Sequence, residues 1–263
     1  MALYGLVADI HGNREALAAA LEALACRGVR RLLCLGDIVG YNADPDECVT
    51  MLHERGALTI AGNHDLIALG RLDFARCSNK ARYALQCTRR RLAPASGTYL
   101  AALPDHRLIE QHIVLVHGGV RDVEQYMVNG AHIKQNAEYL RADYPGARLC
   151  FFGHSHEQKI YRVDGDAVEE IPLQTLNTLD PDALYFVNPG SVDASRKREQ
   201  KFAECAILDA AARTVEFLRV PYDAAATEAK AAVFGYRITP WMERMYSLRR
   251  RLLKRGPRRA LAR

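Results

Sequence analysis

Five short polar motifs occur within residues 9–156, and each directly follows an apolar segment. In chain order they are Asp9-Ile10-His11, Gly36-Asp37-Ile38-Val39-Gly40, Gly62-Asn63-His64-Asp65, His117-Gly118 and Gly153-His154-Ser155-His156. They offer carboxylate, imidazole and amide groups and no thiolate, a donor set that suits Mn, Fe, Zn, Ni or Co rather than a cysteine-rich structural zinc. The motifs therefore predict a transition-metal site built from residues that are far apart in the chain.

The apolar segment before each motif predicts the strand that positions it. Residues 3–8, 31–35 and 57–61 are short apolar runs separated by helical patterns. This alternation predicts a sheet covered by helices. Because ligands collect at the carboxyl ends of the strands in such sheets, we expect Asp9, Asp37 and Asn63 to meet at one rim. Two further runs, 112–116 and 148–152, would deliver the remaining histidines.

Helix starts are indicated by capping residues before helical patterns. Asn13, Asp44 and Ser78 are each expected to cap a helix, with Pro45 in the first helical position after Asp44. Residues 66–108 look largely helical, and residues 119–146 form a connection with one helix around 132–142.

The pattern changes to strands without long helices after residue 156. Strands are expected at 159–163, 167–171, 184–187, 204–208 and 214–219, with a hairpin turn at 164–166. We expect these strands to form a second, mostly antiparallel sheet packed on the first. The predicted fold class is α/β (α+β), a two-sheet αββα sandwich in residues 1–221. A basic helical C-terminal extension, residues 222–263, is expected to pack on this domain or project from it.

The composition is that of an ordinary globular protein of 263 residues with a net charge of +5. Nine of the 36 basic residues lie from Arg244 onward, which leaves 27 basic against 31 acidic residues elsewhere. The basic character therefore belongs to the C-terminal tail. Seven scattered cysteines suggest reduced packing residues, and no signal peptide or membrane-spanning run is visible, so we expect a cytoplasmic protein.

The ordered set of motifs resembles the calcineurin-like metallophosphoesterase superfamily. The combination of GDIVG, GNHD and GHSH looks most like its small bacterial phosphodiesterase branch and less like the Ser/Thr protein phosphatases. The resemblance implies two divalent metal ions, with manganese preferred over Fe, Zn, Ni or Co. It implies that Asp37 bridges them, that Asp9, His11 and His156 complete the first site, and that Asn63, His117 and His154 complete the second.

The reaction implied by the resemblance is hydrolysis of a phosphodiester or phosphomonoester by attack of a metal-bridging hydroxide. His64 would contact the phosphate and protonate the leaving oxygen, a task that suits an imidazole with a reference pKa of about 6.5. Asp65 is the expected partner that orients His64. Both residues are therefore predicted to be catalytic.

Contacts with the substrate are less defined by the motifs. Asn63 is expected to contact substrate as well as metal, and Arg121 could either grip a phosphate oxygen or pair with an acidic residue. Tyr41 and Asn42 are candidates for reading the leaving group. The loop 188–191, Asn-Pro-Gly-Ser, either lines the site or is a plain turn.

Several readings of the function remain open from the sequence. The substrate could be a small phosphoester or a nucleotide, and the enzyme alternatives are a protein phosphatase, a dinucleoside polyphosphate hydrolase or a nuclease. A different class would be a metal-bound regulatory protein of low activity that binds nucleic acid through its basic tail. A solubilising or oligomer-contacting helix is the simpler explanation of that tail. No membrane partner is expected.

Overall fold

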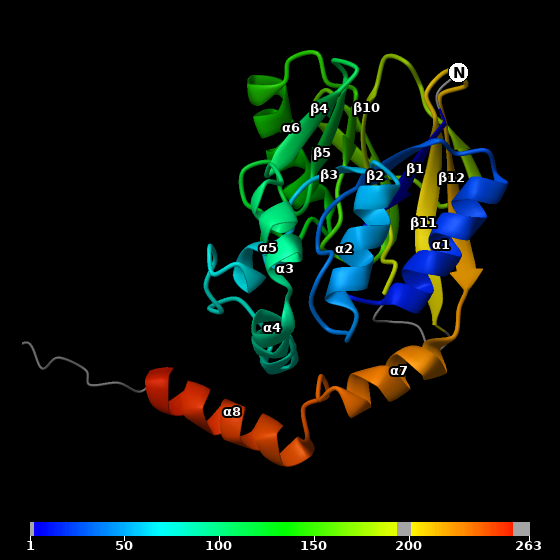
Figure 1. Ribbon diagram of the computed structural model, residues 1–263. Helices are drawn as coiled ribbons and strands as arrows, with labels where there is room; N and C mark the ends of the chain where they lie inside the picture. Colours follow the sequence, from blue (N-terminus) through cyan, green and yellow to red (C-terminus); the bar gives the residue numbers. More distant parts are fainter. Residues whose placement is uncertain (1–2, 194–200, 255–263) are drawn as a thin grey trace, which may run out of the picture.

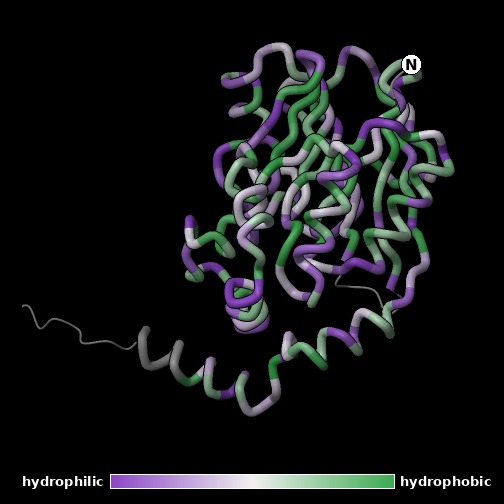
Figure 2. Tube along the Cα trace, in the orientation of Figure 1, coloured by the Kyte–Doolittle hydropathy of each residue, from purple (hydrophilic) through white to green (hydrophobic). Residues whose placement is uncertain are grey.

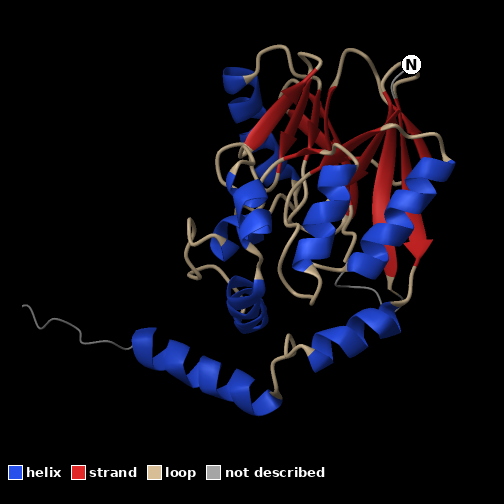
Figure 3. Ribbon diagram, viewed as in Figure 1, coloured by secondary structure: helices blue, strands red, loops and turns tan. Residues whose placement is uncertain are grey.

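Two six-stranded sheets stack face to face in the computed structural model, which describes residues 3–193 and 201–254 (Figure 1). Helices cover the outer faces of both sheets (Figure 3). The predicted αββα sandwich is confirmed, and both sheets contain parallel and antiparallel pairs. Residues 255–263 of the predicted basic tail lie outside the described residues.

The first sheet has the strand order β3-β2-β1-β11-β12-β9. Its members are β1 (Leu3–Val7), β2 (Arg31–Cys34), β3 (Leu58–Thr59), β11 (Phe202–Asp209), β12 (Thr214–Pro221) and β9 (Leu176–Thr178). The strands β1, β2 and β3 are parallel, as expected from their alternation with helices. Their carboxyl ends therefore lie at the same edge of the sheet.

The second sheet has the strand order β4-β5-β6-β10-β7-β8. Its members are β4 (His106–Ile109), β5 (Ile113–Val116), β6 (Leu149–Phe151), β10 (Leu184–Pro189), β7 (Gln158–Asp164) and β8 (Ala167–Glu170). The expectation that the strands after residue 156 alone form this sheet is wrong. The late strand β11 instead pairs with β1, whose other edge is occupied by β2, so that early and late strands mix in both sheets.

Helices from different parts of the chain flank the sandwich. α1 (Arg14–Cys26) and α2 (Pro45–Glu54) lie on the first sheet, and α6 (Gly130–Asp143) lies on the second (Figures 1 and 3). The segment between β3 and β4 forms α3 (Asn63–Ala68), α4 (Asn79–Arg91) and α5 (Pro94–Ala101). The C-terminal segment forms α7 (Ala224–Val233) and α8 (Pro240–Lys254). The predicted domain boundary falls in the short connection between β12 and α7, and the division itself stays a prediction.

Capping agrees with the sequence at two of the three expected positions. The side-chain oxygens of Asn13 and Ser78 accept the backbone N–H groups of Ala16 and Ala81, each at 3.1 Å. Asp44 precedes α2, but its side chain makes no capping hydrogen bond. Its carboxylate instead forms an ion pair with the Lys230 ammonium of α7, and this pair takes the place of a capping hydrogen bond.

Three apolar layers hold the sandwich together, and the strand period of two explains them. In β2, Leu33 packs between the two sheets, whereas its neighbours Leu32 and Cys34 pack under the helices of the first sheet. The third layer lies between the second sheet and α6 and includes Phe186 and Ile133. Apolar residues concentrate along these strands in Figure 2. The strand ends are thus anchored on both faces.

All seven cysteines are free thiols, and six of them are buried, as expected for packing residues.

Trp241, Met245 and Leu248 form an apolar row on α8, but their exposed fractions are 70%, 49% and 53%. Within the described ranges, none of the helices combines the length and apolarity needed to cross a membrane.

Candidate metal centre

The backbone of the ligand-bearing loops is unusual. Five of the eight described non-glycine residues with a positive φ are predicted metal ligands: Asp9, His11, Asp37, His154 and His156, with φ between 52° and 64°. This region is costly for residues with a Cβ and is often found at functional sites. The backbone N–H groups of Ile10 and His11 both donate to the Asp37 carbonyl, which joins the first two motifs. Hydrogen bonds between neighbouring strand ends therefore stabilise the strained backbone of these loops.

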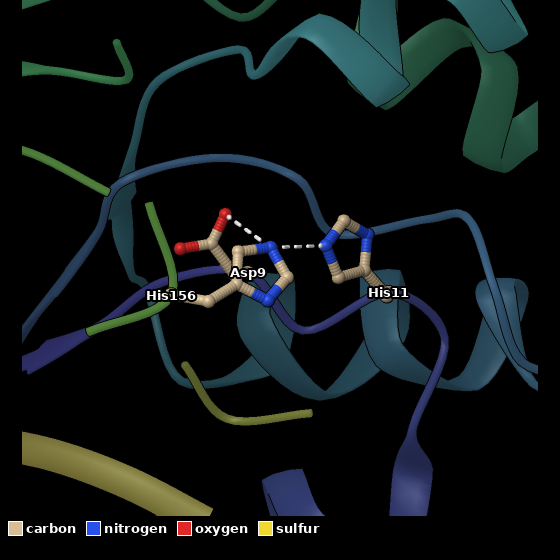
Figure 4. A group of neighbouring side chains, drawn as sticks. All are labelled: Asp9, His11 and His156. Carbon is tan, nitrogen blue, oxygen red and sulfur yellow. Dashed lines mark hydrogen bonds and ion pairs between the residues drawn. The ribbon is translucent and has the colours of Figure 1, made fainter. Parts of the chain in front are cut away.

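The first group of ligands consists of Asp9, His11 and His156, with exposed fractions of 0–2%. The two Nε2 atoms of His11 and His156 lie 3.0 Å apart, and His156 Nε2 lies 3.4 Å from Asp9 Oδ1 (Figure 4). The Asp9 carboxylate also accepts the backbone N–H of His154, so both oxygens are oriented. Two imidazole nitrogens and one carboxylate oxygen thus converge, and a shared cation would satisfy all three.

The second group surrounds His117. Its Nδ1 donates to the Leu35 carbonyl at 2.7 Å, which leaves Nε2 as the ligand atom. This Nε2 lies 3.1 Å from Asn63 Oδ1 and 3.3 Å from Asp37 Oδ2. Ligand atoms of Asp37, His117 and His154 all lie within 4.8 Å of one another. The expected second set of donors is therefore assembled.

Asp37 lies between the two groups. Its Oδ2 is 3.8 Å from His11 Nε2 as well as 3.3 Å from His117 Nε2, and its Oδ1 accepts the backbone N–H of His64. Burial disfavours the charged carboxylate, but attraction to His117 and His64 holds the pKa of Asp37 well below its usual value. Burial similarly opposes the protonation of His117, yet Asp37 raises the pKa of His117 to about 9. The position and the retained charge of Asp37 fit a bridging ligand.

His64 lies against the first group of ligands. Its ring centroid is 4.5 Å from that of His11 and 5.0 Å from that of Tyr41. Gly40 permits this approach, because a Cβ there would lie 2.5 Å from His64 Nδ1 and 2.8 Å from His11 Nδ1. His64 also has a ligand atom within 4.8 Å of those of His11 and Asp37, so it is close to the reacting centre. Its role as the acid stays a prediction.

Asp65 makes hydrogen bonds with the backbone of two motifs. Its Oδ1 accepts the backbone N–H groups of Ile38 and Val39 at 2.9 and 3.1 Å, and its Oδ2 accepts that of Gly62 at 2.9 Å. As the third residue of α3, Asp65 folds back on the helix start and secures the loop that carries Asp37. Its expected role in orienting His64 stays a prediction.

Arg121 pairs with an acidic residue, one of the two alternatives expected from the sequence. Its guanidinium makes two hydrogen bonds with the exposed Asp143 carboxylate, at 2.9 and 2.7 Å, and lies 4.4 Å from the Tyr139 ring centroid. A contact of Arg121 with the substrate stays a prediction.

Different residues line the hollow over the metal centre. A cavity of about 140 Å³ is bounded by Asp37, Asn63, His64 and His154, and also by Arg76 and Tyr126. The Tyr126 ring centroid lies 4.0 Å from that of His154. No motif signalled Arg76 and Tyr126, because they lie in irregular segments that only the folded chain brings to the site.

The loop 188–191 supports the site from behind. Asn188 Nδ2 donates to the Gly153 carbonyl at 2.9 Å and to Ser155 Oγ at 3.0 Å. Ser191 Oγ donates to the Asp9 carbonyl at 3.0 Å. The loop thus fixes two ligand-bearing segments. Of the two leaving-group candidates, Tyr41 lines the cavity, whereas Asn42 is buried and does not line it.

Comparisons with known proteins agree with this geometry. Residues 2–213 match the model of the calcineurin-like phosphoesterase superfamily domain. An uncharacterised protein of Methanocaldococcus jannaschii is 29% identical over 93% of this chain and 97% of its own length. A metallophosphoesterase from Sphaerobacter thermophilus has a TM-score of 0.74 and 29% identity, covering 92% of this chain and 96% of its own.

A hypothetical protein from Pyrococcus horikoshii has the same fold, with a TM-score of 0.72 and 19% identity, covering 90% of this chain and 95% of its own. The donor set, the strand ends that carry it and the match over residues 2–213 all agree. This chain therefore belongs to the calcineurin-like phosphoesterase superfamily.

Proposed function

We propose that this chain is a dinuclear-metal phosphoesterase that hydrolyses phosphodiester or phosphomonoester bonds, as in the small bacterial phosphodiesterases of its superfamily. The observation that carries the proposal is the convergence of three overlapping groups of ligand atoms, each within 4.8 Å, of which two contain Asp37 and two contain His11. Asp9, His11 and His156 would hold one ion, Asn63, His117 and His154 would hold the other, and Asp37 would contact both. All seven residues are at most 6% exposed.

Two bound divalent ions would supply a water-derived nucleophile at neutral pH and would offset negative charge on the phosphoryl oxygens. Residues of the protein would bind the phosphoryl group and supply the proton. Asn63 contacts the phosphoryl group, and His64 donates a proton to the leaving oxygen. Arg76 and Tyr126 border the cavity that receives the phosphate and limit the access of water.

Manganese is the proposed native metal, with Fe, Zn, Ni or Co as alternatives that suit the same donors. Cys77 also lines the cavity, but burial raises the pKa of its thiol to about 11, so the neutral thiol is a poor ligand. The donors are therefore the nitrogen and oxygen atoms of the five motifs.

The test is removal and restoration of the metal. The purified protein is treated with a chelator, and hydrolysis of bis(4-nitrophenyl) phosphate is measured before and after Mn²⁺ is added. We expect activity to be lost on chelation and restored by the metal. Unchanged hydrolysis by protein shown to be metal-free would reject the proposal.

A further inference from the structure

A second, larger cavity adjoins the metal centre. Its volume is about 590 Å³, within the range of small-molecule sites, and His156 of the metal centre lies in its lining. Tyr41 and Ser78 line both this cavity and the smaller one over Asp37 and His64. The two cavities therefore lie side by side, with Tyr41 and Ser78 between the metal centre and the larger one.

The C-terminal segment forms the outer side of this cavity, and we call Ala224, Thr227, Glu228 and residues 236–238 the C-terminal wall. Figure 1 shows α7 running beneath the ends of α1 and α2. Arg237 secures the wall by donating to the Tyr41 carbonyl at 2.9 Å, to Asn42 Oδ1 at 3.0 Å and to Glu228 at 2.7 Å. The wall is therefore joined to the loop that follows Asp37.

The floor of the cavity carries hydrogen-bonding groups. Asp193 Oδ1 accepts the side-chain amides of Asn13 and Asn42 at 2.8 and 2.7 Å. The Tyr222 hydroxyl accepts a longer hydrogen bond from the Asn13 amide at 3.3 Å. A carboxylate with neighbouring amides and a phenol suits a ligand with several hydroxyl groups, as an acidic residue suits the ribose of a dinucleotide.

The sides of the cavity suit an uncharged aromatic group. Tyr41 and Tyr222 are only partly buried, so their rings can contact a planar ligand. Lys80 and Lys201 are exposed in the lining, and the negative charges of Asp193 and Glu228 oppose them. Arg237 is paired with Glu228, so three cationic side chains face two carboxylates and the lining has an excess of one positive charge, which an uncharged group tolerates.

We propose that this cavity binds the nucleoside of a nucleotide phosphodiester whose phosphoryl group lies over Asp37. The inference rests on the proposed function and adds a substrate class and a binding site to it. In the reaction, the oxygen of water bonds to phosphorus, one phosphorus–oxygen ester bond breaks, and the alcohol leaves with a proton. Tyr222 and Asp193 would recognise the nucleoside, and the C-terminal wall would enclose it.

The first experiment compares two substrates with the same leaving group. Thymidine 5′-(4-nitrophenyl) phosphate and methyl 4-nitrophenyl phosphate both release nitrophenol and differ only in the other ester group. For the wild-type protein we expect kcat/KM to be at least tenfold higher for the thymidine ester. Tyr222→Ala should reduce this ratio at least fivefold, whereas Tyr222→Phe should keep most of it because the ring remains. Tyr139→Ala, on α6 beside Arg121, is the matched control and should keep the ratio.

The second experiment measures binding without catalysis. Saturation-transfer NMR with thymidine should detect binding to the full chain and to Asp37→Asn, and binding should be lost in Tyr222→Ala. Binding lost in Tyr222→Ala supports the site even if neither ester is hydrolysed, a result that would reject only the proposed function. Hydrolysis of both esters at equal rates, with no thymidine binding, would overturn the nucleoside site and leave the phosphoesterase proposal standing.

Discussion

The rim that carries the metal ligands and the C-terminal wall beside it are held in different ways. The ligands are at most 6% exposed, and the strands beneath them are packed between apolar layers. The wall depends on polar contacts, in which Thr227 binds Asn13 and Arg237 binds Asn42, and beside it Lys230 pairs with Glu15 of α1. Its residues range from buried to exposed.

This contrast assigns different tolerances to the two regions. Removing one partner of a buried charge pair costs about 3–5 kcal/mol, whereas a more exposed pair contributes roughly 0–1 kcal/mol. Substitution of a buried charged residue at the rim is therefore expected to disrupt the metal centre. The wall can change its contacts, and with them the preferred substrate, while the chemistry remains.

The largest effect is expected when Asp37 is removed from the rim. Asp37→Ala should lose metal and lower kcat by about a thousandfold or more, because the residue contacts both ligand groups. Metal content by mass spectrometry and hydrolysis of bis(4-nitrophenyl) phosphate are the two measurements. Asp166→Ala, in the exposed turn between β7 and β8, is the control. Full metal content in Asp37→Ala would contradict the bridging assignment.

His64 separates binding of the metal from the reaction. His64→Ala should keep its metal and lower kcat by about 10²–10⁴-fold, the usual contribution of a positioned acid. Metal analysis and steady-state kinetics on the same preparation provide the comparison. If the variant hydrolyses the ester as fast as the wild type, the residue is not the acid.

Arg237 tests whether the wall is independent of the rim. Arg237→Ala removes three hydrogen bonds that join the wall to Glu228 and to the loop after Asp37. At about 1 kcal/mol for each bond, we expect KM for the thymidine ester to rise roughly tenfold or more while the metal content stays normal. Lys159→Ala, which breaks an ion pair on β7, is a matched control. Loss of metal in Arg237→Ala would show that the two regions are not independent.

The smallest effect is expected at the contact between α1 and α7. Burial opposes the ionisation of Glu15, but hydrogen bonds from Lys230 and Thr227 outweigh it and lower the pKa of Glu15. A carboxyl group whose pKa is lower in the folded than in the unfolded state stabilises the fold at pH values above its unfolded-state pKa. This stabilisation is lost as the pH falls through the folded-state pKa. Glu15→Gln should therefore reduce the free energy of unfolding by about 1 kcal/mol at pH 7 and by less at pH 3. Urea denaturation at both pH values is the measurement, and an equal loss at both would contradict the ion pair.

Motifs in the sequence marked the rim, whereas no motif marked the C-terminal wall as part of a cavity. Asp9, Asp37 and Asn63 could be predicted at one rim, because polar motifs follow short apolar strands and parallel strands end at a common edge. The hydrogen bonds that Asp65 makes with the backbone could not be predicted, since adjacent residues at a helix start point in different directions and Asp65 turns back to Gly62. For Arg121 the sequence left two partners open, a phosphate oxygen or an acidic residue, and in the folded chain Arg121 pairs with Asp143.

The fold class, the ligand types and the chemistry that such ligands allow can be predicted from the chain alone, because they depend on local patterns and on side-chain identity. The pairing of β11 with β1, the position of Arg76 and Tyr126 at the metal centre and the second cavity beside the C-terminal wall are visible only in the folded molecule. These features join segments up to about 200 residues apart, such as Arg237 and Asn42. Their meeting depends on how apolar layers pack rather than on any pattern within one segment.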